Sequence, residues 1–207
     1  MRCAALPVDG RVTSPQGWRN RPSGADLHTG VDIGAPEGSP VYAMFSGRVA
    51  VAATTGELAG YGNVVVLEHG DYSLYAHLAR LDVDQGELVQ AGQQIGTVGR
   101  TAGTRENPAA VFSSSGAHLH LEFLDRWPPR GRDLDRLDVG QVLAAAGVMV
   151  PAQGPLQAVC GTVPRPASQP QDARPAKPVR ASSGSGGAVA LLLALLFLGQ
   201  HFGQLKN

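Results

Sequence analysis

Short apolar runs separated by glycine-rich turns fill the first 125 residues of the chain. Many short strands at regular spacing, with turn signals between them, are typical of an all-β sandwich or barrel. We therefore expect a mainly β fold, a sandwich or barrel, over residues 8–150. The runs that carry this pattern lie at 40–45, 47–52, 63–68, 72–77, 95–98 and 118–123.

Two further local signals refine this picture. Residues 38–43 followed by 47–49 resemble residues 86–91 followed by 96–98 after a one-residue shift, which indicates a faint internal repeat. A single helix is predicted at about 138–146, with Asp138 as its N-cap and Gly147 as its stop signal.

The composition changes after residue 150. Residues 151–187 contain seven prolines and then a Ser/Gly run, which predicts a disordered, solvated linker. Residues 188–204 are predicted to form a C-terminal hydrophobic helix. Its strictly apolar part, 188–198, has 11 residues, whereas a membrane span takes about 20. A transmembrane anchor and a buried, interfacial or oligomerising helix both stay open.

The charge and the N-terminal residues limit the functions that the sequence supports. Residues 1–150 carry 12 basic against 16 acidic residues, a formal charge of −4, and the remainder carries +4. A mildly acidic domain gives no support for nucleic-acid binding. Residues 1–8 lack the apolar region of a secretory signal, so no signal peptide is expected.

Two short strings of polar residues stand out from the apolar pattern, His-Thr-Gly-Val-Asp at 28–32 and His-Leu-His at 118–120. Side chains on a strand alternate between its faces, so His28 and Asp32 share one face, as do His118 and His120. A helix would separate the second pair, because two residues advance it by roughly 200°. Histidine and aspartate are zinc ligands, so we expect two strand segments that can converge on one ion.

The cysteine count narrows the kind of zinc site. Catalytic zinc sites keep about three protein ligands and leave a position for water, whereas structural sites fill all four, usually with cysteine. Only Cys3 and Cys160 are present, which excludes a structural cysteine site. Without a signal peptide the two cysteines are expected as free thiols, although a periplasmic destination would permit a disulfide.

Five motifs in a fixed order give the chain a family resemblance. GRVTSPQGWR at 10–19, LHTGVDIGAP at 27–36, GYGN at 60–63, YAHL at 75–78 and GAHLHLEF at 116–123 closely resemble the lysostaphin-type (LytM-like) zinc metalloendopeptidases, which cut peptide cross-links of bacterial peptidoglycan. The resemblance covers roughly residues 8–147. It implies the antiparallel duplicated hybrid motif fold, with which the internal repeat agrees.

Site residues follow from this resemblance position by position. It implies that His28, Asp32 and His120 hold one zinc ion and that His77 and His118 are unliganded catalytic histidines. Bound zinc lowers the pKa of its water and polarises the scissile carbonyl. One histidine would serve as base and the other would donate to the oxyanion. We favour His118 as the base and His77 as the oxyanion stabiliser, with the reverse left open.

The remaining polar residues near the motifs have weaker assignments. Glu122 shares the strand face of His118 and His120, so it is either an acceptor that orients a ligand imidazole or an exposed strand glutamate. His69 lies at an expected hairpin turn and is interpreted as structural. His201 lies in the apolar tail and is not expected at the site.

The chain departs from the family pattern at three places. Residues 104–114 are inserted before His118, and a loop beside a site usually tunes what binds there. Ala117 replaces the usual proline before the histidine pair, and Gln16 replaces the usual aromatic after Ser14 and Pro15. Neither replacement is expected to touch a ligand.

Three functions compete at this point. The first is a zinc-dependent metalloendopeptidase that hydrolyses peptidoglycan stem or cross-bridge peptides in the cell envelope, anchored by its C-terminus. The second is a non-catalytic peptidoglycan-binding or amidase-activator module, which typically lacks metal ligands or catalytic histidines. The third is a structural component of a phage or conjugation apparatus, which the missing export signal would suit.

Overall fold

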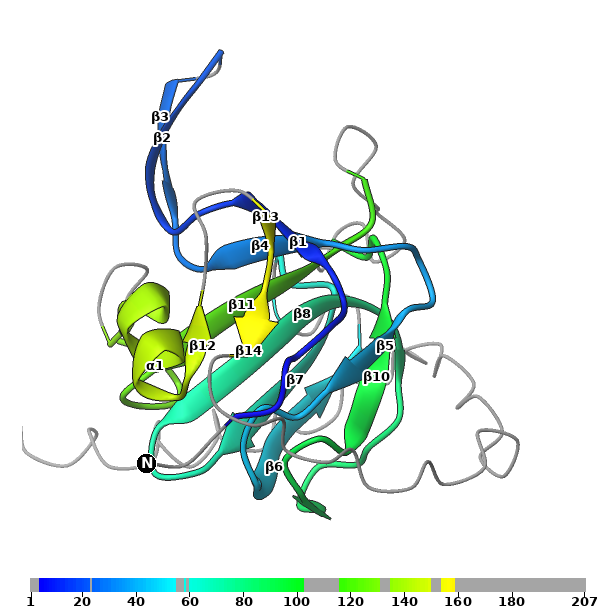
Figure 1. Cartoon of the computed structure of the whole chain (residues 1–207). Coiled ribbons are helices and arrows are strands. Elements are labelled where there is room, and N and C mark those ends of the chain that lie inside the picture. Colours follow the sequence, from blue (N-terminus) through cyan, green and yellow to red (C-terminus); the bar gives the residue numbers. More distant parts are fainter. Residues whose placement is uncertain are drawn as a thin grey trace, which may run out of the picture. The chain divides into compact units, whose positions relative to one another are not determined.

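A large antiparallel sheet organises the molecule, as Figure 1 shows. The computed structural model describes residues 4–22, 24–54, 58, 60–102, 116–130, 135–149 and 154–158. The ten strands of the sheet are β1 (Arg11–Ser14), β4 (Val31–Gly34), β5 (Pro40–Tyr42), β6 (Gly47–Ala53), β7 (Asn63–Glu68), β8 (Tyr72–Leu81), β9 (Leu88–Val89), β10 (Gln94–Val98), β11 (His118–Leu124) and β13 (Gly154–Pro155).

Two smaller antiparallel pairs and one helix complete the described structure. The hairpin β2 (Gly17–Arg21) and β3 (Gly24–His28) stands out from the end of the sheet in Figure 1. The second pair is β12 (Val148–Met149) with β14 (Gln157–Ala158), and the helix is α1 (Val139–Ala145).

The strand order confirms the mainly β, antiparallel prediction and corrects the barrel alternative. The path runs β13-β1-β4-β11-β8-β7-β6-β9, while β10 pairs with both β5 and β8. Its terminal strands are two residues long, and within the described residues β13 pairs only with β1 and β9 only with β6. The ends of this path therefore do not meet, and the sheet does not close.

Strand β11 lies at the centre of the sheet, between β4 and β8, and all seven of its residues are buried. Because strand side chains alternate, Leu119, Leu121 and Phe123 face the main apolar core. His118 and His120 face the other way. Burial of the apolar face therefore fixes which way the histidines point, since a one-residue slip would reverse every side chain.

The two segments of the predicted internal repeat pair with each other reciprocally. Strand β5 of the first unit pairs with β10 of the second, and β9 of the second pairs with β6 of the first. Gly38 N–H donates to Val98 O at 2.8 Å, and Gly86 N–H donates to Val49 O at the same distance. The two glycines also have nearly equal positive φ values, 86° and 88°.

Helix α1 agrees with the prediction at both ends. Asp138 is the N-cap, and its side chain accepts from Gln141 N at 2.8 Å. Gly147 follows the C-cap with a φ of 72°, a left-handed conformation that favours glycine. Val139 and Leu143 are buried and anchor the helix to the core.

The structure describes residues 154–158, a part of the segment predicted as linker. Residues 154–158 form β13 and β14, Pro155 pairs with Arg11, and Leu156 is 7% exposed within the main core. The sequence places them in the linker because residues 151–187 contain seven prolines and a Ser/Gly run. Pairing and one buried leucine nonetheless tie them to the folded domain.

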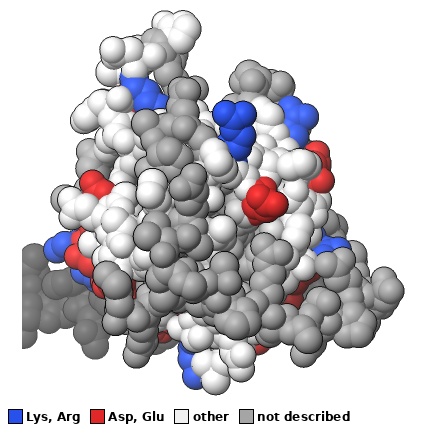
Figure 2. Space-filling model, in the orientation of Figure 1, with Lys and Arg blue, Asp and Glu red and all other residues white. Residues whose placement is uncertain are grey.

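Several predictions concern residues outside the described ranges: the insertion 104–114, the linker from 159 onward, the apolar segment 188–204, Cys3, Cys160 and His201. Among the residues that the structure describes, no helix is long and apolar enough to cross a membrane. Among the described residues on the face shown in Figure 2, the basic residues, all of them Arg, lie apart from one another.

Candidate metal centre

Three predicted ligands converge at one point. His28 Nε2 lies 3.0 Å from Asp32 Oδ1 and 3.2 Å from His120 Nδ1, and the last two atoms are 2.9 Å apart. Zinc bonds of about 2.0–2.2 Å at tetrahedral angles place ligand atoms roughly 3.3–3.5 Å apart. The three donors therefore fit one zinc-sized ion after small shifts.

The sheet register creates this convergence. Strands β4 and β11 pair with His120 directly opposite Asp32, and directly opposed residues share a face. His28 ends β3, so the short connection to β4 brings its ring over the same face. In the chain, His120 is 88 positions from Asp32 and 92 positions from His28. One strand pair and one turn make the three residues neighbours.

Gly30 makes that turn possible. A Cβ on Gly30 would lie 2.3 Å from Leu121 O and 3.0 Å from His120 Cε1. The turn between His28 and Asp32, the two candidate ligands of the first string, therefore passes against β11 with no room for a side chain.

Hydrogen bonds on the far side of each ligand ring select the nitrogen that faces the centre. His28 Nδ1 lies 2.7 Å from Pro15 O, a carbonyl that only accepts, so Nδ1 carries the proton and Nε2 faces the ligands. His120 has the opposite arrangement, because its Nε2 lies 2.9 Å from Glu122 Oε1 and its Nδ1 faces Asp32. Such contacts fix ring orientation and tautomer in metal sites.

The two other predicted histidines lie beside the cluster. His118 Nε2 is 3.8 Å from Asp32 Oδ1, and the ring centres of His77 and His118 are 4.9 Å apart. The ring of His77 is also 5.6 Å from that of His120. The structure thus brings all five predicted side chains together.

His77 has an uncommon backbone conformation. Its φ is 63°, in the left-handed region, and its N–H donates to Tyr61 O at 2.9 Å. Its Nδ1 lies 2.8 Å from Thr101 O. Strained residues of this kind persist where the surroundings over-determine them, and they cluster at functional sites.

Comparison with known proteins agrees with this geometry. The model of Peptidase family M23 matches residues 26–136, more than half of the chain. The chain belongs to peptidase family M23. The resemblance inferred from the five motifs is thereby confirmed.

Within family M23, three similar proteins are informative. The chain is 40% identical over 116 residues to the DD-carboxypeptidase/endopeptidase Mpg of Neisseria meningitidis serogroup B, covering 54% of this chain and 24% of that protein. It is 35% identical over 118 residues to the murein hydrolase activator NlpD of Salmonella dublin, covering 56% and 26%. The chain thus spans about a quarter of these two relatives.

The third similar protein has a solved structure, the antimicrobial peptidase lysostaphin from Staphylococcus simulans. The two structures have a TM-score of 0.53 and 25% sequence identity, covering 69% of this chain and 55% of that chain.

Burial and hydrogen bonding shift the charges of this M23 site. Burial would raise the pKa of Asp32, but hydrogen bonds from His120 and His28 hold it well below its usual range. Burial would lower the pKa of His120, but bonds to Asp32 and Glu122 raise it to about 9. Burial, together with the charges of His120 and His118, lowers the pKa of His77 to about 3. At neutral pH the cluster therefore holds an ionised Asp32 and a protonated His120 beside a neutral His77.

The structure decides between the two interpretations of Glu122 that the sequence left open. It is fully buried and accepts from His120 Nε2, so it orients this imidazole instead of facing solvent. Burial would raise its pKa, but the bond from His120 and other partners lower it to about 2. Sequence reasoning did not identify its partners Tyr61 and Arg136. Tyr61 lies inside the GYGN motif, whereas Arg136 has no motif signal.

Gln16, the departure from the usual aromatic, has a structural role. Its side-chain amide donates to Thr29 O and to Leu137 O, each at 3.2 Å, and accepts from Val139 N at 2.8 Å. It therefore joins the turn between the ligands to the start of α1. It contacts no predicted ligand side chain in these bonds, as the sequence analysis expected.

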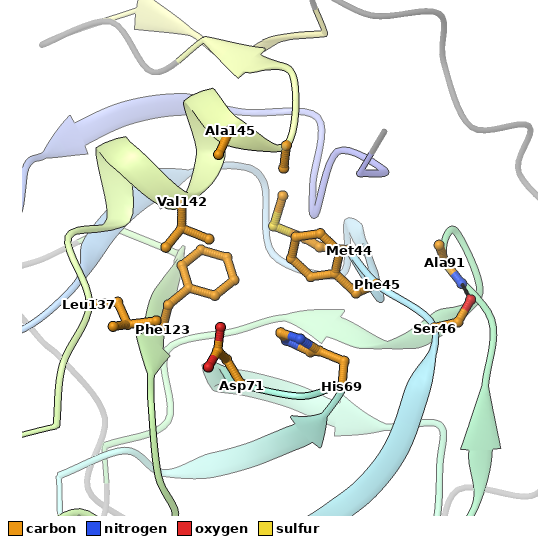
Figure 3. Close-up of a pocket in the computed structure, with 11 residues that line it drawn as sticks. Met44, Phe45, Ser46, His69, Asp71, Ala91, Phe123, Leu137, Val142 and Ala145 are labelled. Carbon is orange, nitrogen blue, oxygen red and sulfur yellow. Dashed lines mark hydrogen bonds between the residues drawn. The ribbon is translucent and has the colours of Figure 1, made fainter. Parts of the chain in front are cut away.

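His69 lies away from the metal centre, in the turn between β7 and β8, as predicted. Its Nε2 is 3.2 Å from Ser73 Oγ, and its ring centre is 4.7 Å from that of Phe45. Figure 3 shows both rings lining a pocket of about 710 Å³ together with Phe123 and residues of α1. Because Phe123 points away from the face that carries His120, this pocket is separate from the metal centre.

Proposed function

We propose that this chain is a zinc-dependent metalloendopeptidase that hydrolyses peptide cross-links in bacterial peptidoglycan. The observation that carries the proposal is the convergence of His28, Asp32 and His120 with two further histidines beside them. The names of Mpg, a DD-carboxypeptidase/endopeptidase, and of lysostaphin, an antimicrobial peptidase, support the reaction class.

His28 Nε2, Asp32 Oδ1 and His120 Nδ1 would hold the zinc ion. When bound, zinc supplies a Lewis acid that lowers the pKa of a water molecule and polarises the scissile carbonyl. Asp32 is ionised, and the contacts with Pro15 and Glu122 turn His28 Nε2 and His120 Nδ1 towards the same point. Because the pKa of His120 is raised to about 9, this imidazole must release a proton when the ion binds.

The two remaining histidines supply proton transfer. Nδ1 of His118 lies 2.9 Å from Gly116 O, so its proton points to that carbonyl and Nε2 of the neutral ring is the basic atom. We assign His118 as the base because this Nε2 lies beside Asp32. The Nδ1 proton of His77 points to Thr101 O, so this residue could donate to the oxyanion only with a second proton on Nε2. Burial opposes that second protonation. The reverse division of roles is therefore the alternative.

The substrate and location follow from the same chemistry. Peptidoglycan stem or cross-bridge peptides are the proposed partners, and the cell envelope is the proposed place of action. The murein hydrolase activator NlpD supports a second candidate, an amidase-activator module. The intact set of five side chains favours the enzyme, since an activator does not need them.

Digestion of defined peptidoglycan by the purified full chain tests this proposal. We expect muropeptides cleaved at a peptide bond, loss of cleavage after chelation, and recovery when zinc is added back. His118→Ala is the matched control for cleavage that does not depend on the site. Intact peptidoglycan, together with faster release of stem peptides by an added amidase, would support the activator and contradict the peptidase.

A further inference from the structure

A buried polar network lies behind the ligand His120. Glu122 has no exposed surface, and the side chain of Arg136 is 8% exposed. The two residues lie on adjacent segments that meet at the bridge between Leu124 and Arg136. A buried ionised carboxylate needs both a charge partner and hydrogen-bond donors to stay ionised.

Each oxygen of Glu122 has its own partners. Oε1 accepts from His120 Nε2 at 2.9 Å, from Tyr61 OH at 3.0 Å and from the hydroxyl of Thr29. Oε2 accepts from Arg136 Nε at 3.0 Å. The guanidinium therefore holds one oxygen while the other is directed at the ligand imidazole.

Tyr61 joins this network to the other half of the site. Its hydroxyl accepts from Arg136 Nη2 at 3.1 Å and donates to Glu122. Its backbone carbonyl accepts from the N–H of His77, the residue with the left-handed backbone. One residue thus contacts the support of the ligand His120 and the backbone of the proposed catalytic His77.

We propose that Arg136 is a positioning residue for the metal centre. It holds Glu122 so that the carboxylate accepts from Nε2 of His120, and this keeps the lone pair of Nδ1 directed at the ion. The inference rests on the proposed zinc site. Removing a partner of this kind typically weakens metal affinity about 10- to 100-fold.

The test measures zinc affinity of the full chain by competition with a chromophoric chelator. We expect Arg136→Gln to bind zinc about 10-fold or more weakly. Arg136→Lys should be intermediate because a lysine keeps the charge but lacks the planar fork of donors of the guanidinium. Arg130→Gln is the matched control. That arginine is 61% exposed and pairs with Asp135, so its loss should leave zinc affinity unchanged.

A double-mutant cycle separates positioning from a general structural effect. If Arg136 acts through Glu122, the loss caused by Arg136→Gln should shrink towards zero in a Glu122→Gln background, because coupled residues are not additive. An equal loss in both backgrounds, or wild-type affinity in a folded Arg136→Gln, overturns the proposal. If Arg136→Gln does not fold, Tyr61→Phe takes its place and must lower zinc affinity, and unchanged affinity there also overturns it.

Failure of the role proposed for Arg136 can be distinguished from failure of the proposed peptidase function. Zinc binding with the expected coupling, but with no cleavage of any peptidoglycan, would contradict the proposed reaction and leave the role of Arg136 standing. Failure of the wild-type chain to bind zinc would contradict both.

Discussion

Gly30 is the position where one added methyl group should disturb both folding and metal binding. A Cβ built there lies 2.3 Å from Leu121 O, whereas real Cβ contacts essentially never fall below 3.0 Å. The difference means that β11 must move by at least about 0.7 Å relative to the turn. The obstacle is a backbone carbonyl in the central strand, so no side-chain rotation can relieve it.

The size of the effect follows from two opposing contributions. Overpacking of a well-packed site costs about 1–3 kcal/mol. Alanine also restricts the unfolded chain, which offsets about 0.4–1 kcal/mol of that cost. We therefore expect Gly30→Ala to lower the free energy of unfolding by about 1–2 kcal/mol. His120 moves with β11, so zinc affinity should fall as well.

Urea unfolding in the presence of a chelator and a separate zinc titration measure the two effects. Gly116→Ala is the control, because a Cβ there meets nothing within 4 Å and the position has no positive φ. If Gly30→Ala matched the wild type in both unfolding free energy and zinc affinity, the contact argument would be refuted.

Three further predictions test other parts of the account. Asp138→Ala should lower the free energy of unfolding by about 1 kcal/mol through loss of the helix N-cap, whereas Asp138→Asn should nearly preserve it, as thermal denaturation would show. A fragment of residues 1–158 should unfold cooperatively at a higher temperature than a fragment of residues 1–150, because the shorter one loses the buried Leu156 and the pairing of β13 with β1; equal midpoints would contradict this. Replacement of residues 104–114 by a short turn should change which wall types are cleaved more than it changes stability, and identical cleavage of every wall type would remove this loop from substrate selection.

Much of the fold could be predicted because local signals and tertiary packing agree. The period-two spacing of His118 and His120 identified a strand, since the apolar residues between and after them face the core. The helix could be predicted because Asp138 is a typical N-cap residue and Gly147 a typical residue after a helix C-terminus. The repeat was visible because paired turns need glycine at equivalent positions.

The rest depends on contacts that no local pattern encodes. Residues 154–158 have the composition of a linker, and only the pairing with β1 makes them part of the sheet. Arg136 lies far from every motif, and its role depends on the bridge that brings it to Glu122. The sequence also left the burial of Glu122 open, because a strand glutamate can face either solvent or a buried partner.

We propose that His28, Asp32 and His120 hold zinc while His77 and His118 act on the substrate. Zinc content of purified variants, measured by elemental analysis alongside cleavage of peptidoglycan, tests this division most directly. We expect His120→Ala to lose zinc and activity together, and His118→Ala to keep its zinc and lose activity. Full zinc retention in His120→Ala together with zinc loss in His118→Ala would contradict it.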